Sequence, residues 1–258
     1  MVHLLEDYAY NNGLKNINPQ FKMLFAIITL IVSLIATSPV IPLIIAFFIF
    51  LLLYFEAKIP ISVYLKLISI PILFGLFNLV FMTLFFGVNE PWFSLGFLNL
   101  VAYKDGFNLG LLLFSRMLGG FSCMVFLILT TPVSELLFLA ESLKVPKIVT
   151  EIALLMYRYI FVFLEEAEKM YHAQETRCGY SGFKKTLKSL GLLISNLFIR
   201  SWTRGDVIYL AMQSRCYDGS IKIFNSNNQI NIKPLLLIIT FESLLLFGVY
   251  FTRGFTVI

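Results

Sequence analysis

Two short phrases with the same spacing carry the clearest functional pattern in this sequence. Ala173 precedes Arg177 by four residues, and Ala211 precedes Arg215 by four residues. Residues four apart share one face of a helix, so each small alanine would let a partner surface approach a guanidinium with five donors and a permanent charge. One arginine near a helix end would only complement the helix dipole. Two copies favour a pair of sites that dock a partner protein.

The residues that flank both arginines extend the repeat. A cysteine follows each arginine directly, and a glycine comes soon after it. The flanking residues of the two docking phrases are Gln174, Cys178, Gly179, Ser214, Cys216 and Gly219. Glycine readily adopts the left-handed conformation at a helix C-terminus. We therefore expect Gly179 to end the helix that carries the first phrase.

Charged residues inside apolar segments form a second candidate site. Arg116 lies in the middle of one such segment and Glu242 in the middle of another. Intramembrane charges are costly and usually paired, so these two side chains could pair with each other or with Glu135, Glu141 or Arg158. They could line a transport pathway. Because the chain has so few such groups, we favour a structural polar clamp between helices, formed by Arg116, Glu242 and Arg158.

Metal-binding and catalytic residue types are sparse. The two histidines are His3 and His172, and the three cysteines are Cys123, Cys178 and Cys216, with no CxxC pair. His172, Cys178 and Cys216 would form a metal site only if the two docking phrases met. The sequence has no P-loop, no glycine-rich nucleotide turn and no acidic DxxD cluster, and we interpret the acidic residues at 165–168 as a solvated helix face. We therefore predict no catalytic residue and no metal bound by this chain.

The composition indicates that the bilayer is the solvent of this protein. Of its 258 residues, 59% are hydrophobic and 14% are charged, with a mean hydropathy of +0.84; a soluble domain carries about 25% charged residues. Residues 141–233 hold 13 of the 20 basic side chains and 8 of the 15 acidic ones, which accounts for the whole net charge of +5. A basic segment beside apolar spans is typical of cytoplasmic loops and of contact with anionic lipid. We therefore expect no nucleic-acid partner.

The apolar segments predict an all-α, polytopic membrane protein with about five or six crossings. We expect an N-terminal transmembrane bundle over residues 1–131, a cytoplasmic and partly embedded helical coupling module over 132–233, and a C-terminal transmembrane helix over 234–258. Pro19 would begin the first helix, and Lys22 would extend to the lipid headgroups. The apolar spans are Met23–Thr37, Leu43–Phe55, Leu67–Phe86, Phe107–Thr131 and Leu235–Phe251.

Long helices are expected to carry the docking phrases. Lys147–Arg177 would reach about 45 Å if unbroken, with an apolar first half in the membrane and a polar second half along the cytoplasmic face. Two shorter helices, Phe183–Ser201 and Gly205–Cys216, would follow, and the second would carry the second docking phrase. The charge distribution places the N-terminus and these coupling helices in the cytoplasm.

Taken together, these motifs resemble the transmembrane T component of energy-coupling-factor (ECF) transporters over nearly the whole chain. Residues 18–22, Asn-Pro-Gln-Phe-Lys, resemble the family's opening Asp-Pro-Arg-x-Lys, and Arg116 with residues 130–132 resembles its fourth-helix pattern. The two docking phrases resemble its coupling motifs, which usually read Ala-Arg-Gly. Here Thr176 and Ser214 precede the arginines, and cysteines follow them. Residues 157–161 and 217–219 are closest to the cobalt/nickel branch.

The resemblance implies a non-enzymatic coupling subunit of an ATP-driven importer in the cell membrane, with cobalt or nickel as the expected substrate. Two cytoplasmic ABC-type ATPase subunits, which bind ATP and Mg²⁺, would each receive one arginine motif. A separate substrate-binding membrane subunit, the S component, would hold Co²⁺ or Ni²⁺, and this chain would bind no cofactor. A T subunit for a vitamin, a self-contained secondary transporter and a membrane-embedded enzyme are the alternatives.

Overall fold

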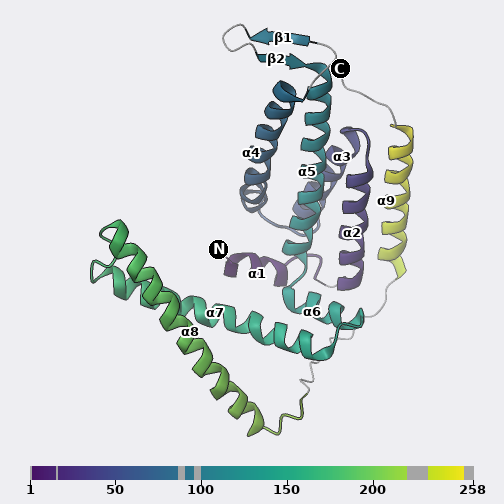
Figure 1. Ribbon diagram of the computed structural model, residues 1–258. Helices are drawn as coiled ribbons and strands as arrows, with labels where there is room; N and C mark the ends of the chain where they lie inside the picture. Colours follow the sequence, from purple (N-terminus) through teal and green to yellow (C-terminus); the bar gives the residue numbers. More distant parts are fainter. Residues whose placement is uncertain (1, 16, 87–90, 96–99, 220–231, 253–258) are drawn as a thin grey trace. The chain divides into compact units, whose positions relative to one another are not determined.

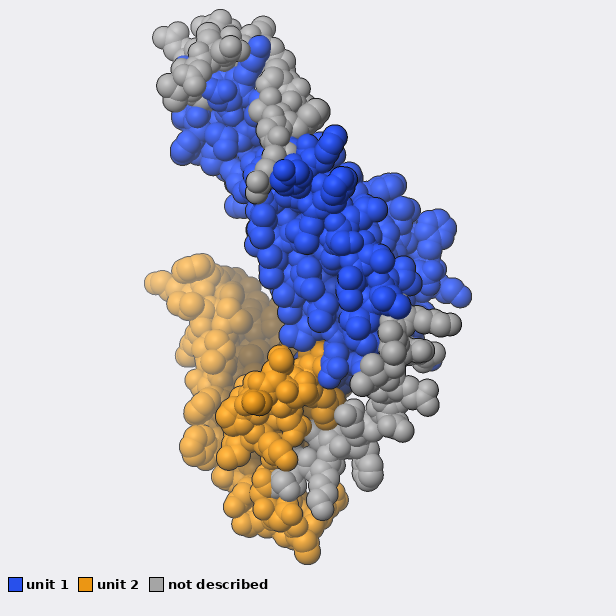
Figure 2. Space-filling model, turned by 90° about the vertical axis from the view of Figure 1, so that its right-hand side faces the viewer, with its two compact units in different colours: residues 1–135, 227–258 blue, residues 136–226 orange. Residues whose placement is uncertain are grey.

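The computed structural model describes residues 2–15, 17–86, 91–95, 100–219 and 232–252, and these residues are almost wholly helical (Figure 1). The chain divides into two compact units, shown in blue and orange in Figure 2. Unit 1 comprises residues 1–135 and 227–258, and unit 2 comprises residues 136–226. The predicted C-terminal helix therefore groups with the N-terminal bundle. The predicted boundary at residue 233 lies beside residues 220–231, which are outside the described residues.

Unit 1 is a helical bundle organised around α5. This helix packs against α1, α2, α3 and α4, while α9 packs against α2 and α3 (Figure 1). The helices of unit 1 are α1 (Val2–Tyr10), α2 (Pro19–Ile35), α3 (Val40–Phe55), α4 (Ile61–Phe85), α5 (Lys104–Thr130) and α9 (Ile232–Phe251). The loop predicted between the third and fourth spans also contains a short antiparallel hairpin of β1 (Pro91–Leu95) and β2 (Leu100–Tyr103).

The lengths and exposed surfaces of these helices fit a membrane-spanning bundle. Among the described residues, α4 with 25 residues and α5 with 27 are long and apolar enough to cross a bilayer, and α2, α3 and α9 are shorter apolar helices. Large apolar side chains of α4 point away from the bundle; Leu73, for example, is 74% exposed. Exposed apolar side chains of this kind are stable in the hydrocarbon core of a bilayer, because they do not contact water there.

Local signals at the start of α2 are confirmed. Pro19 occupies the first turn, and the Asn18 side chain accepts a hydrogen bond of 2.9 Å from the Gln20 backbone N–H. This N-cap satisfies one of the donors that every helix start leaves open. α2 ends at Ile35, and α3 begins at Val40, directly after Pro39. The predicted helical hairpin is therefore present in α2 and α3.

The prediction that Lys22 reaches the headgroups is wrong. Its side chain is 3% exposed, and its Nζ donates to the Thr130 carbonyl at 2.9 Å. The last carbonyls of α5 lack helical donors and form the negative end of the helix dipole, so they bind the ammonium inside the bundle. The Asn12 amide also donates to Thr130 at 3.3 Å. Burial raises the pKa of nearby Glu135 above its ordinary value even though Lys22 opposes this shift.

Unit 2 is built from two long helices. After α6 (Val133–Ser142), which begins in unit 1, come α7 (Lys147–Glu175) and α8 (Phe183–Gln213). The predicted break before Gly205 is wrong, because α8 is continuous over 31 residues. An interior glycine costs a helix only about 1 kcal/mol, and the space around Gly205 is open. The Thr203 hydroxyl donates to the carbonyls of Ile199 and Arg200, four and three residues earlier in the same helix. Thr203 therefore does not interrupt α8 either.

Candidate functional site

Each docking phrase forms the same turn at the end of a long helix. After α7, the Gly179 N–H donates to the Gln174 carbonyl at 2.9 Å, and the Cys178 N–H donates to the Glu175 carbonyl at 2.9 Å. Cys178 has a φ of +57°. This pair of bonds around a left-handed residue is a Schellman motif. Arg177 directly precedes the left-handed residue.

The turn after α8 repeats this geometry. The Tyr217 N–H donates to the Met212 carbonyl at 3.1 Å, and the Cys216 N–H donates to the Gln213 carbonyl at 3.0 Å. Cys216 has a φ of +60°, and Arg215 directly precedes it. The hydroxyl before each arginine also bonds back to the alanine of its phrase, at 3.1 Å from Thr176 to Ala173 and 2.9 Å from Ser214 to Ala211. The repeat seen in the sequence is therefore a repeat in three dimensions.

The paired cysteines occupy the backbone position that glycine usually fills in this motif. The prediction that Gly179 ends α7 is therefore off by one residue, because Cys178 takes the left-handed conformation. The hydrogen bonds of the turn set this conformation, and they involve backbone atoms that every residue has. Both thiols are free and exposed. The two cysteines therefore share one backbone conformation in the two turns, and nothing in the structure explains why this residue is cysteine.

Substitution at Cys178 tests this backbone requirement. We expect Cys178→Gly to leave stability unchanged or to raise it by up to about 1 kcal/mol, because glycine has no Cβ penalty at positive φ. We expect Cys178→Val to lower stability by about 1–2 kcal/mol, because a β-branched residue is strongly disfavoured there. Thermal unfolding of the purified chain in detergent measures the difference. Equal unfolding temperatures for the two variants would contradict the assignment.

The four residues predicted to dock a partner are accessible. Ala173, Arg177, Ala211 and Arg215 are all exposed. Among the residues that the structure describes, neither the Arg177 nor the Arg215 guanidinium has a hydrogen-bond or ion-pair partner. Each guanidinium therefore keeps its full set of donors for a carboxylate or carbonyl of another protein.

A closed polar network holds the first turn against the start of α8. The Tyr180 hydroxyl donates to the Gln174 amide oxygen at 2.7 Å, and the Gln174 amide nitrogen donates to the Ser189 carbonyl at 3.1 Å. The Ser189 hydroxyl then donates to the Gly179 carbonyl at 2.9 Å. Gln174 therefore supports the turn from within instead of facing a partner. A side chain at Gly179 would not fit, because its Cβ would lie 2.8 Å from the Ser189 hydroxyl oxygen.

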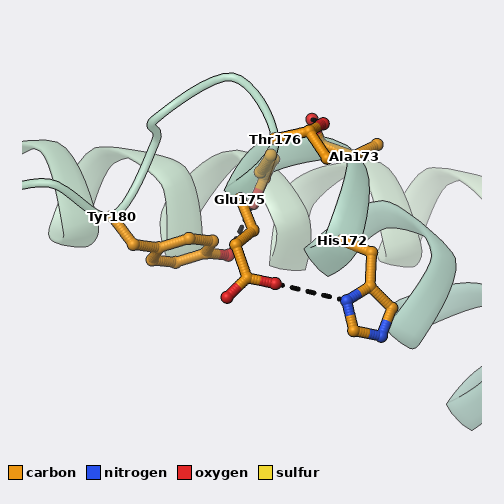
Figure 3. A network of polar contacts seen from close by, with 6 residues as sticks. His172, Ala173, Glu175, Thr176 and Tyr180 are labelled. Carbon is orange, nitrogen blue, oxygen red and sulfur yellow. Dashed lines mark hydrogen bonds and ion pairs between the residues drawn. The ribbon is translucent and has the colours of Figure 1, made fainter.

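On its outer side the first turn carries a small acid–base pair. Figure 3 shows the Glu175 carboxylate directed at the His172 ring, with Tyr180 on the other side of the carboxylate. The Glu175 Oε2 to His172 Nδ1 distance is 3.3 Å. Both side chains are exposed, so the pair contributes little to stability. In the part of the chain that the structure describes, no three or more His, Cys, Asp or Glu side chains are grouped to hold a metal ion.

The second turn is connected to the start of α7. The Tyr217 hydroxyl donates to Glu151 Oε2 at 3.3 Å, across 66 residues of sequence. Loss of hydration and the neighbouring Glu151 carboxylate raise the pKa of Tyr217 above its ordinary value. The phenol is therefore protonated at neutral pH and donates this bond. Gly219, the last flanking residue of the phrase, has a φ of +89°. The pairing of Tyr217 with Glu151 was missed by the sequence analysis, since no local pattern joins residues so far apart.

The intramembrane charges of unit 1 are each bonded to α2. Arg116 donates from Nε and Nη2 to the Ala36 carbonyl at 3.0 and 2.8 Å, which satisfies the open C-terminal end of α2. Glu242 bonds through Oε1 to the Thr29 hydroxyl at 2.5 Å. Neither of these bonds joins Arg116 to Glu242, so the two side chains do not pair directly with each other. Arg158, the third predicted member, lies on α7 in unit 2 and is exposed.

Comparison with known proteins gives one consistent result. Residues 11–224 match the family described as CbiQ, cobalt transport protein. An uncharacterized protein of Methanocaldococcus jannaschii is 45% identical over 98% of this chain and 95% of its own length. A protein of Methanocorpusculum labreanum named as a fused cobalt transport protein, CbiMQ, is 31% identical over 94% of this chain and 41% of its own length. The energy-coupling factor transporter transmembrane protein EcfT of Streptococcus thermophilus is 28% identical over 79% of this chain and 80% of its own length.

Proposed function

Because the chain belongs to the CbiQ cobalt transport protein family, we propose that it is the coupling (T) subunit of an ATP-driven ECF-type importer of cobalt or nickel. The chain is a membrane component of an ECF-type transporter, as its CbiQ and EcfT relatives indicate. Within that role, it receives movement from ATPase subunits and passes it to a separate substrate-binding membrane subunit. It performs no catalysis itself.

The observation that carries this proposal is the pair of matched arginine turns. Their backbone bonds repeat atom for atom, and both guanidiniums are exposed without a partner among the described residues. Two equal sites suit two similar partner subunits, so each ATPase subunit takes one arginine into a surface groove. ATP and Mg²⁺ are then bound by those subunits. The basic charge around the turns favours a cytoplasmic location for them and for the N-terminus.

The relatives support cobalt and a second membrane subunit. The matching family and the relative from Methanocorpusculum labreanum both carry cobalt transport in their names, and that relative is named as a fusion. The region of that fusion aligned with this chain is 41% of its length, so most of it is a different sequence in the same polypeptide. We propose that the corresponding partner of this chain is the subunit that holds Co²⁺ or Ni²⁺. The EcfT relatives are not named for cobalt, so a T subunit of a vitamin importer is the second candidate function.

Co-purification from mild detergent tests the proposed assembly. We expect the chain to bring down two ATPase subunits and one further membrane protein, and the complex in vesicles to take up Co²⁺ or Ni²⁺ only with ATP. A complex that takes up a vitamin instead would transfer the proposal to the second candidate. Uptake by this chain alone without ATP would overturn it and identify a self-contained transporter.

A further inference from the structure

The two arginine turns are held in place by different contacts. The first turn is fastened locally, because Tyr180, Gln174 and Ser189 join the end of α7 to the start of α8 within a few residues. The second turn is fastened at long range, because the Tyr217 hydroxyl reaches Glu151 near the start of α7. The turns are thus alike in backbone geometry and unlike in their support.

Packing does little to hold α8 in place. None of its 31 residues is buried, and tertiary packing normally supplies most of the stability of a helix in a protein. Polar contacts therefore restrain α8 against α7. Between its two ends, Arg204 donates to Glu166 at 3.1 Å. The exposure of these side chains weakens that middle contact. Glu151, by contrast, is 8% exposed, so its bond to Tyr217 is the better protected of the two long-range contacts.

We propose that Tyr217 is a positioning residue that holds the C-terminal end of α8, and with it the second arginine turn, against the start of α7 through its bond to Glu151. This bond connects the C-terminal end of α8 to the N-terminal part of α7, while the Tyr180–Gln174–Ser189 network connects their other ends. The two helices then form a frame joined at both ends, and the bond sets the angle between them.

The proposal has a consequence for coupling that rests on the proposed function. A displacement of Arg215 by its ATPase subunit would reach the start of α7 through Tyr217 and Glu151. Without this bond the displacement would be lost as the end of α8 swings freely. Docking of each arginine would continue, because the backbone bonds of both turns do not involve the Tyr217 hydroxyl. ATP hydrolysis would then run without transport.

A labelled pair that spans the Tyr217–Glu151 contact measures its effect. Cys216 is exposed in the second turn, and Lys147→Cys adds an exposed thiol at the start of α7. Cys178→Ser removes the thiol of the first turn, and Cys123 is 1% exposed and remains unlabelled. Spin labels on residues 147 and 216 of the full chain in lipid nanodiscs report the distance from the end of α8 to the start of α7 by electron spin resonance. We expect one narrow distance while Tyr217 is present. We expect Tyr217→Phe to shift the population about tenfold toward a broad distribution, as expected for loss of a bond to a charged group.

Matched variants separate positioning from general destabilisation. Tyr180→Phe removes the equivalent hydroxyl from the first turn, where the Gln174 and Ser189 bonds remain, and should keep the narrow distance. Glu151→Gln keeps an acceptor oxygen and should preserve most of the narrow population, whereas Glu151→Leu should lose it. An unchanged distribution in Tyr217→Phe would overturn the proposal. This experiment needs no partner subunit, so it stands even if co-purification shows that the proposed function is wrong.

Discussion

Reversing the charge of both exposed arginines, as Arg177→Glu with Arg215→Glu, should detach the ATPase subunits and abolish ATP-driven uptake. Arginine side chains at the centre of an interface contribute about 2 kcal/mol or more each, so each ATPase subunit loses about thirtyfold in affinity, and a pair of subunits that binds as one unit loses roughly a thousandfold. The introduced carboxylates add repulsion wherever the partner groove is acidic. Co-purification from mild detergent, followed by uptake in vesicles, measures both effects.

Control variants distinguish docking from bulk charge. Lys184 and Arg200 are exposed basic residues of α8 outside the turns, so Lys184→Glu with Arg200→Glu makes the same change in net charge and should keep the ATPase subunits bound. Arg177→Lys keeps the charge of the first turn but lacks the forked donors, and should give an intermediate loss. If the double reversal at the turns co-purifies and transports like the natural chain, the proposed docking role of these arginines is wrong.

Long apolar segments and their proline boundaries could be predicted from the sequence. Pro19 at the start of α2 and Pro39 directly before α3 act through local backbone geometry, and the observed helices begin there. The continuity of α8 was missed because a single interior glycine costs little against many good helix formers. The burial of Lys22 was missed for another reason. Which carbonyls remain open at the end of α5, and which amine reaches them, is decided by tertiary packing.

The residues proposed for docking were also only partly predictable. Their repeated spacing singled out Ala173, Arg177 and their second copies as candidates, but each arginine lies in the turn just beyond its helix and not on a helix face shared with the alanine. The left-handed conformation at Cys178 was assigned to its glycine neighbour, since residue type is the only local guide to positive φ and glycine is the usual choice. The bond from Tyr217 to Glu151 has no local signal at all. The contact that holds the second turn to the start of α7 therefore became visible only in the folded chain.

Adding a single methyl group at Gly119 should destabilise the bundle far more than the same change one residue later. A Cβ at Gly119 would lie 2.6 Å from the Ser33 hydroxyl oxygen and 2.9 Å from the Pro42 carbonyl oxygen, whereas a Cβ at Gly120 meets nothing within 4 Å. Overpacking of this kind costs about 1–3 kcal/mol. Gly120→Ala should be neutral or stabilising by up to about 1 kcal/mol, because alanine is the better helix former. Thermal unfolding in detergent compares the two variants.

The Ser33 hydroxyl makes the origin of this effect measurable. It is fully buried and has no hydrogen-bond partner among the described residues, so Ser33→Ala alone should cost little. In Gly119→Ala the same change removes the closer of the two clashes, and the double variant should recover part of the lost stability while the Pro42 carbonyl still limits it. A double-mutant cycle reports this coupling. Purely additive effects would show that α5 moves away from α2 in Gly119→Ala. Arg116, one turn before Gly119, would then lose its bond to the Ala36 carbonyl.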